Sequence, residues 1–146
     1  MTRTLSFLLL FAVSQIGLFG KVFHVYSPSS KENALWVVKA IPQGEGLKLE
    51  VSEKVEFDFS GRVITAHPSK PLLYVTATGG DPGKVPGAVV FLNKDGSYQK
   101  HQKVNFNDGA CYMSIDKENR HILGVSYRNG RLNVYPLDDN GIPGKA

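Results

Sequence analysis

The stretch KVEFDFSGRVITAHPSKP, residues 54–71, returns without gaps as KVNFNDGACYMSIDKENR, residues 103–120, which lies 49 positions further along the chain (103 − 54). Lys, Val and Phe recur at the start of both copies, and Ile64 aligns with Met113. Each copy shows the same order of features: the end of a charged strand, a short polar loop, an alternating segment and a tight turn. A strand-built repeat of this length is typical of the blades of a β-propeller.

Short segments rich in β-branched and aromatic residues, separated by Gly, Pro, Asn and Asp, make up the chain beyond residue 20. The Asp95-Gly96 pair between two apolar runs is a strong hairpin signal, and no segment shows sustained helical spacing. The sequence therefore predicts an all-β fold of four-stranded antiparallel meanders. The expected strands are residues 22–26, 34–41, 47–55, 63–67, 72–76, 88–92, 97–104, 111–115, 121–127 and 131–137.

The strand expected at residues 47–55 alternates between apolar and polar residues. Leu47, Leu49 and Val51 fall on one face, and charged residues fall on the other. This alternation predicts a half-buried strand whose charged face lies at the exposed edge of a sheet.

The expected strands group into three blades, at about residues 21–57, 62–106 and 110–146, of which only the middle one has all four strands. Residues 21–146 number 126, or about 2.6 repeats (126/49), whereas closed propellers have four to eight blades. An open stack leaves two apolar sheet faces uncovered. We therefore expect the chain to be a fragment of a larger propeller; the alternative is assembly with copies of itself.

Residues 1–20 have the pattern of a secretory signal peptide. Arg3 provides a positive charge, residues 5–13 form an apolar core, and small residues near 14 and 20 offer cleavage positions. The alternative is a membrane anchor, but the uncharged residues 4–20 are fewer than the roughly 20 apolar residues that a spanning helix needs. We expect a secreted or periplasmic protein without a stable membrane span.

The composition argues against several kinds of site. The net charge is +4 with basic and acidic residues interspersed, so no basic stripe suggests a nucleic-acid partner. A single cysteine, Cys111, excludes an internal disulfide and a cysteine-based zinc site. The four histidines show no metal-binding spacing, and we expect neither a metal nor another cofactor.

Several motifs follow one another in a set order. A His-Pro turn leads into a Leu-Tyr-Val strand, and a small-residue loop leads into a Ser-x-Asp turn. The motifs are VFHVYSPSSKENALWVV (22–38), TAHPSKPLLYVTA (65–77), the strand and Asp-Gly hairpin of 87–96, GACYMSIDKEN (109–119), GVSYRNG (124–130) and YPLDDNG (135–141). In this order and spacing the chain from 22 to 146 resembles the N-terminal third of the seven-bladed propeller lactonases, the 6-phosphogluconolactonase-like group.

The resemblance implies a seven-bladed, monomeric parent that hydrolyses a sugar lactone without a metal, with the cytoplasm as the usual location for the family. The substrate it implies is a sugar lactone or another anionic small molecule. The chain departs from the family pattern at Tyr112, where the family has His, and at Ser126, where it has Asn. The family's catalytic His and Arg lie in later blades, so the catalytic residues are unknown here and this fragment is expected to be inactive. The alternative is a non-catalytic secreted propeller that acts as a binding or scaffold module.

Tyr112, Tyr127 and Arg128 are the candidate substrate-binding residues, because they sit where expected inner and second strands begin or end, near the mouth of a propeller channel. A guanidinium at Arg128 could hold a carboxylate or phosphate through two parallel hydrogen bonds. The alternative is a solvated turn arginine.

Three further residues are assigned structural roles. His67, which precedes a proline at a strand end, is expected to be a turn residue rather than a catalytic acid or base. Cys111 has no basic neighbour in sequence and is expected to be buried rather than nucleophilic. Trp36, on an apolar strand, is expected in the core.

Overall fold

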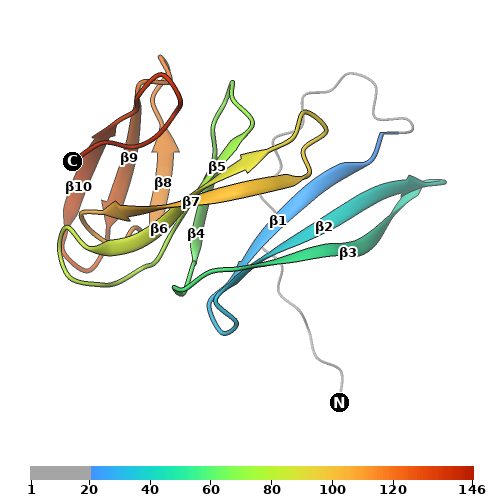
Figure 1. The fold of residues 1–146 in the computed structure, drawn as a ribbon, viewed down its shortest axis with the longest axis horizontal. Coiled ribbons are helices and arrows are strands. Elements are labelled where there is room, and N and C mark those ends of the chain that lie inside the picture. The colour runs from blue at the N-terminus through green and yellow to red at the C-terminus, as the bar shows by residue number, and fades with distance from the viewer. Residues whose placement is uncertain (1–20) are drawn as a thin grey trace.

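The structure is a computed structural model that describes residues 21–146, in which every regular element is a β-strand (Figure 1). The signal peptide expected at residues 1–20 lies outside the described residues. The strands are β1 (Phe23–Ser29), β2 (Ala34–Gln43), β3 (Gly46–Glu56), β4 (Val63–Ala66), β5 (Leu72–Thr76), β6 (Val85–Leu92), β7 (Tyr98–Phe106), β8 (Tyr112–Ile115), β9 (His121–Ser126) and β10 (Arg131–Pro136).

The strands form three antiparallel sheets, ordered β1-β2-β3, β4-β5-β6-β7 and β8-β9-β10. Figure 1 shows the sheets following one another in chain order, with β1–β3 at one side and β8–β10 at the other. The two aligned copies of the repeat place β4 and β8 at residues 63 and 112, and β5 and β9 at 72 and 121, each 49 apart. The predicted all-β fold of propeller-type meanders is therefore confirmed.

Two strands, β1 and β6, extend three residues beyond the bounds that the sequence predicts. β1 runs on into the polar segment that we expected to be a loop, and it includes Pro28, which pairs with Leu35. Because β1 lies at a sheet edge, the missing amide hydrogen of Pro28 need not break a ladder. β6 begins at Val85 inside the expected glycine-rich loop, because Val85 is fully buried and pairs with Phe106.

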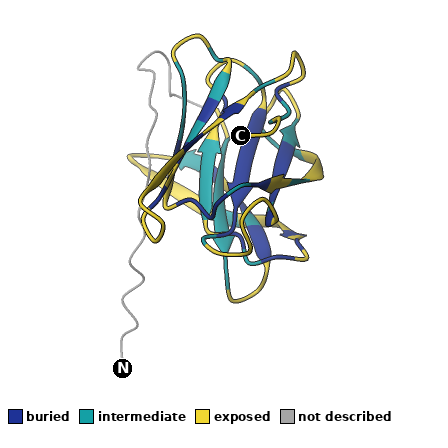
Figure 2. Cartoon of the chain, turned by 90° about the vertical axis from the view of Figure 1, so that its left-hand side faces the viewer, coloured by how far each residue is buried: buried dark blue, intermediate teal, exposed yellow. Residues whose placement is uncertain are grey.

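The core lies between neighbouring sheets and is centred on β5 and β6 (Figure 2). All five residues of β5 are buried, so this strand packs on both of its faces. Leu35 and Val37 of β2 fill the junction on one side, and Ile122 and Tyr135 belong to the third sheet on the other. The Tyr74 hydroxyl donates a hydrogen bond of 2.8 Å to the Gly141 carbonyl and so ties the second sheet to the segment after β10.

Two expectations about burial are wrong. The apolar face of β3 is exposed at Leu47, Leu49 and Val51, because none of the described residues packs over that side of the first sheet. Trp36 is only half-buried, and the Lys54 ammonium lies 5.4 Å from the centre of its ring. The third sheet is likewise uncovered on one face, at Tyr112, Val125, Leu132 and Val134.

Alternate turns gather at one end of the sheets, because the strands alternate in direction. We call this end the loop rim and define it as residues 30–33, 57–62, 77–84, 107–111 and 127–130. Hydrogen bonds between its segments confirm the proximity: the Phe57 amide donates to Asn33 at 2.6 Å, and the Gly83 amide donates to Asn107 at 2.7 Å. Among residues 21–146, no helix has the length and apolar character needed to cross a membrane.

Candidate functional site

All three substrate-binding candidates lie at the loop rim. Tyr112 begins β8 with 61% of its surface exposed, and Tyr127 follows β9 with 83% exposed. The two strand ends are joined by the Cys111 amide, which donates to the Val125 carbonyl at 2.8 Å, and by the Tyr127 amide, which donates to Cys111 Sγ at 3.4 Å. Two tyrosines are thus presented to solvent from neighbouring strands of the third sheet.

Arg128 extends from the third sheet toward the second. A Cβ placed on Gly79, in the β5–β6 loop, would lie 3.8 Å from Arg128 Nη1. Arg128 forms no ion pair with any residue in the part of the chain that the structure describes. Its guanidinium therefore keeps an uncompensated positive charge beside a glycine backbone, which suits an anionic ligand.

The β7–β8 connection packs against the β5–β6 loop. A Cβ on Gly109 would lie 2.2 Å from the Thr78 carbonyl carbon and 2.4 Å from the Gly79 amide nitrogen. No side chain fits in that space, so glycine allows the two backbones to touch. This contact fixes the position of the Gly79 backbone, which lies next to Arg128.

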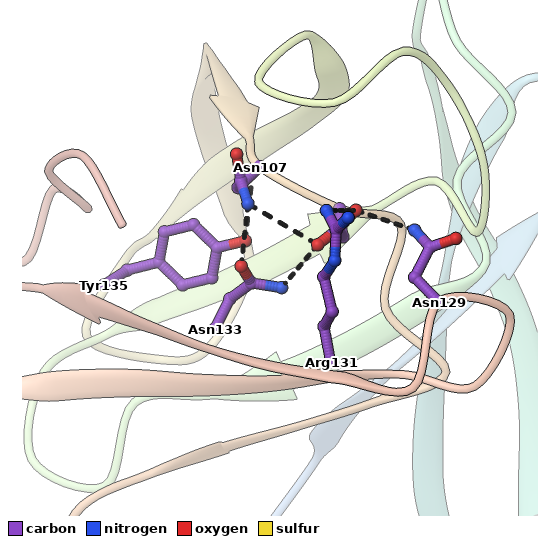
Figure 3. A network of polar contacts seen from close by, with 6 residues as sticks. Asn107, Asn129, Arg131, Asn133 and Tyr135 are labelled. Carbon is purple, nitrogen blue, oxygen red and sulfur yellow. Dashed lines mark hydrogen bonds and ion pairs between the residues drawn. The ribbon is translucent and has the colours of Figure 1, made fainter.

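Beside Gly109 lies a buried carboxylate, Asp108, with 4% of its surface exposed. Figure 3 shows the polar side chains around it, which come from the β7–β8 connection, the β9–β10 turn and β10. We call this group the Asp108 cluster: Asn107, Asp108, Asn129, Arg131, Asn133 and Tyr135.

The hydrogen bonds of the Asp108 cluster are directional. Asn129 Nδ2 donates to Asp108 Oδ1 at 2.7 Å, and Asn133 Nδ2 donates to Asp108 Oδ2 at 3.0 Å. Asn107 Nδ2 donates to Asn133 Oδ1 at 2.8 Å and more weakly to Asp108 Oδ2 at 3.5 Å. Arg131 Nη1 lies 3.7 Å from Asp108 Oδ1. Both carboxylate oxygens therefore serve as acceptors for donors on the turn and on β10.

The surroundings keep the carboxylate charged. The hydrogen bond from Asn133 lowers the pKa of Asp108 most. Asn129 and Arg131 lower this pKa further, and burial raises it. The phenol of Tyr135 accepts a hydrogen bond of 3.0 Å from the Asn107 amide, and burial raises the pKa of Tyr135. The cluster thus holds one negative charge, shared among amide donors and one arginine.

Sequence reasoning missed the Asp108 cluster. The repeat alignment carries a signal for it. Asp108 takes the position that Phe59 holds in the earlier copy, so a carboxylate replaces an aromatic ring. Arg62 aligns with Cys111, and both are exposed at the rim, just before an innermost strand. The expected burial of Cys111 is wrong, because no described residue covers this position at the rim.

His67 lies at the opposite end of the sheets, in the β4–β5 turn. Its Nδ1 accepts hydrogen bonds from the amides of Ser69 at 3.1 Å and Lys70 at 3.0 Å. Burial lowers the pKa of His67, with a smaller contribution from the charge of Lys70. His67 is therefore a turn residue, as its position before a proline predicts, and it is remote from the rim.

Other polar groups do not make a metal site. Within residues 21–146, no three His, Cys, Asp or Glu side chains are arranged to hold a metal ion. An open hollow of about 530 Å³ lies at the end opposite the rim, between the first sheet and the β6–β7 turn, and it includes His24, Glu50 and Asp95. The exposed aromatic and cationic candidates, Tyr112, Tyr127 and Arg128, lie at the rim and not at this hollow.

The comparisons with known proteins agree with this architecture. Residues 28–146 match the family described as "Lactonase, 7-bladed beta-propeller". Curated protein sequences give no significant match. Among solved structures, the chain is similar to a protein from Bacteroides fragilis provisionally assigned as a 6-phosphogluconolactonase, with a TM-score of 0.65 and 13% sequence identity. The match covers 88% of this chain and 35% of that protein, so the chain spans about a third of its length.

Proposed function

Because the chain belongs to the family of seven-bladed β-propeller lactonases, we propose that it is one part of a larger propeller that hydrolyses the ring of a sugar lactone. The observation that carries the proposal is the family match over residues 28–146, on three sheets that are stacked in chain order. The substrate is a small molecule with an anionic group, which suits the uncompensated charge of Arg128 at the rim.

The rim residues described here bind and orient the substrate. Tyr112 and Tyr127 offer ring faces and hydroxyl groups to a sugar, and Arg128 takes a carboxylate or phosphate through paired hydrogen bonds. Hydrolysis further needs a base that activates water and cationic groups that stabilise the oxyanion formed on the lactone carbonyl. We assign these steps to residues of other blades, so residues 21–146 by themselves are inactive.

The test compares the complete natural propeller with the isolated stretch 21–146. Both are assayed by proton release with 6-phospho-δ-gluconolactone and with neutral δ-gluconolactone, against the spontaneous rate of ring opening. We expect turnover by the complete propeller and none by the stretch alone. The complete protein binding either lactone without opening it would instead identify a non-catalytic binding propeller. Turnover by 21–146 that is lost in Arg128→Ala would place a working site within these sheets.

We also propose that the protein is exported, because residues 1–20 combine Arg3 with an apolar core and small residues near 14 and 20. N-terminal sequencing of the protein from its native host should give a start close to Gln15 or Lys21. A start at Met1 or Thr2 would contradict cleavage.

A further inference from the structure

One arginine, Arg128, lies within the β9–β10 turn and another, Arg131, begins β10, and their surroundings differ. Arg131 Nη1 lies 3.7 Å from Asp108 Oδ1, so its charge is compensated. Arg128 has no carboxylate partner among the described residues and lies against Gly79. One arginine therefore belongs to the Asp108 cluster, and the other is available to a ligand.

Asp108 holds the turn through the residue that follows Arg128. Asn129 Nδ2 donates to Asp108 Oδ1 at 2.7 Å, and Gly130 adopts the left-handed conformation with φ of 58° that closes the turn. The second carboxylate oxygen binds Asn133 on β10. The carboxylate thus connects the turn and the start of β10 to the β7–β8 connection, and it restricts where the backbone next to Arg128 can lie.

The same connection sets the surface opposite Arg128. Gly109 follows Asp108 directly and touches the backbone of Thr78 and Gly79. Among the described residues, the amides of Gly79 and Gly80 donate no hydrogen bond, and both glycines are exposed. A guanidinium beside an exposed glycine backbone, where no side chain blocks the approach, is a favourable environment for a phosphate or carboxylate oxygen.

We propose that Asp108 is a positioning residue for an anion subsite that is formed by Arg128 and the exposed backbone of Gly79. It rests on the proposed function, because the anion is the phosphate or carboxylate of the sugar lactone or of its ring-opened product. Asp108 holds the turn through Asn129, and its charge pairs with Arg131. Arg128 is therefore the arginine of this hairpin that is free to bind the anion.

The directions of the hydrogen bonds allow a test by Asp108→Asn, which replaces one carboxylate oxygen by an amide nitrogen. In Asp108→Asn, one oxygen becomes an amide donor, and both Asn129 and Asn133 already point donors at this side chain. Both contacts can persist only if the exposed Asn129 side chain turns over and presents its oxygen to the new amide, and in every case the negative charge that compensates Arg131 is removed. The carboxylate that holds the turn is thus lost, while the shape of the side chain at 108 is unchanged.

A second change at Asn133 restores the hydrogen bonds, with donor and acceptor exchanged between positions 108 and 133. In Asp108→Asn/Asn133→Asp, the amide at 108 accepts from Asn129 through its oxygen and donates to the new carboxylate at 133. That carboxylate still accepts from Asn107, as Asn133 Oδ1 does now at 2.8 Å. Net charge and all three short hydrogen bonds are kept, so this swap variant is a matched control.

The experiment measures binding of 6-phosphogluconate to the complete natural propeller by calorimetry at low salt. We expect Arg128→Ala and Asp108→Asn each to weaken binding by about tenfold to a hundredfold, the range for a charge-assisted hydrogen bond. The double variant Asp108→Asn/Arg128→Ala should bind no more weakly than Arg128→Ala alone, because both changes act on one contact. The swap variant should recover binding to within about threefold of the natural protein.

Turnover and melting provide the readouts that a purely structural role would not produce. Asp108→Asn should raise KM for the phosphorylated lactone and leave kcat/KM for the neutral lactone within about twofold. A common loss on both lactones, or additive effects of Asp108→Asn and Arg128→Ala, would overturn the proposal. So would natural binding by Asp108→Asn, or absent binding by a swap variant that melts normally. If the natural protein opens neither lactone, the proposed function fails, and the calorimetry still decides on the subsite.

Discussion

The connection between the first and second sheets, residues 57–62, and that between the second and third, residues 107–111, occupy equivalent places in the repeat and are built from different chemistry. In the first, Phe57 and Phe59 stack with ring centres 4.8 Å apart and planes 11° from parallel. In the second, Asp108 stands where Phe59 stands in the first and binds amide groups instead.

The neighbouring position shows a matching difference. Ser60 reaches back to the preceding sheet and donates a hydrogen bond of 3.1 Å to the Ser30 carbonyl. Gly109, its equivalent, replaces that side-chain bridge by direct contact with the backbone of Thr78. An apolar stack is enough where a connection only closes a junction. A polar cluster is found where the connection also holds a turn, the one that carries the exposed Tyr127 and Arg128.

The largest effect should come from removing the aromatic stack. Phe59→Ala takes a ring that is 6% exposed out of the junction and should lower the free energy of unfolding by about 4 kcal/mol. Phe59→Leu, the control, should cost clearly less because it keeps most of the volume. Urea denaturation of the complete protein measures both, and a loss below about 1 kcal/mol for Phe59→Ala would mean that the stack does not hold the junction.

Adding one carbon at the second connection should be nearly as damaging. In Gly109→Ala the new Cβ would meet the Thr78 carbonyl carbon at 2.2 Å, so backbone must move, at a cost of about 3 kcal/mol. Ser60→Ala, the matched change at the first connection, removes one hydrogen bond and should cost about 1 kcal/mol. Equal losses for the two variants would show that the junctions are built alike.

The turns at the opposite end offer a smaller contrast, which depends on pH. His67 and Asp116 occupy equivalent positions, and each accepts two backbone hydrogen bonds within its turn, Asp116 Oδ1 from the Arg120 amide at 2.6 Å and the His121 amide at 3.0 Å. Burial lowers the pKa of His67, and hydrogen bonds from His121 lower that of Asp116.

The signs place the two losses in different pH windows. Folding favours neutral His67, so its contribution is complete above about pH 6.5 and declines as the pH falls through the lower folded pKa. Asp116 contributes above about pH 3.9 and loses its contribution only as the pH falls further. Between about pH 7.5 and pH 5, hydrogen exchange should therefore quicken at Ser69 and Lys70, after correction for intrinsic rates, and should not quicken at Arg120, because Asp116 stays ionised in this range. Parallel changes in both turns would contradict this assignment.

The smallest effect is expected at Cys111. Its thiol is exposed, so Cys111→Ser should change the free energy of unfolding by no more than about 0.5 kcal/mol. A thiol reagent should label Cys111 in the folded protein at a rate close to that in the denatured one. Protection from labelling would contradict this and would show that Cys111 is buried, as its sequence suggests.

Local sequence signals were enough to predict the strands. Alternation and the Asp95-Gly96 turn are properties of neighbouring residues, and the repeat at 54–71 and 103–120 shows the same local signals twice. The strands lie where these signals place them, apart from the extensions of β1 and β6. The same signals placed Tyr112, Tyr127 and Arg128 at strand ends, which the structure brings to one rim.

What the sequence did not predict depends on contacts between sheets. The apolar face of β3 looked half-buried, but burial of Leu49 requires a neighbouring sheet and not only alternation. Asp108 is polar in a polar segment, NDG, so nothing local distinguishes it from a solvated loop residue. Its burial follows from the close approach of Gly109 to Thr78, which joins residues that are 31 apart in the chain (109 − 78).

Every hydrogen-bonded pair of strands within residues 21–146 joins strands that are consecutive in the chain. During translation, each strand therefore meets its partner as soon as the next segment leaves the ribosome, and no strand waits for one made much later. Contacts that are near in sequence form quickly, and exposed unpaired edges invite aggregation. The sheets are thus synthesised in the same order in which they lie next to one another in the fold. A pause in translation once residues 57–62 or 107–111 have left the ribosome would leave finished sheets outside it rather than half-paired strands.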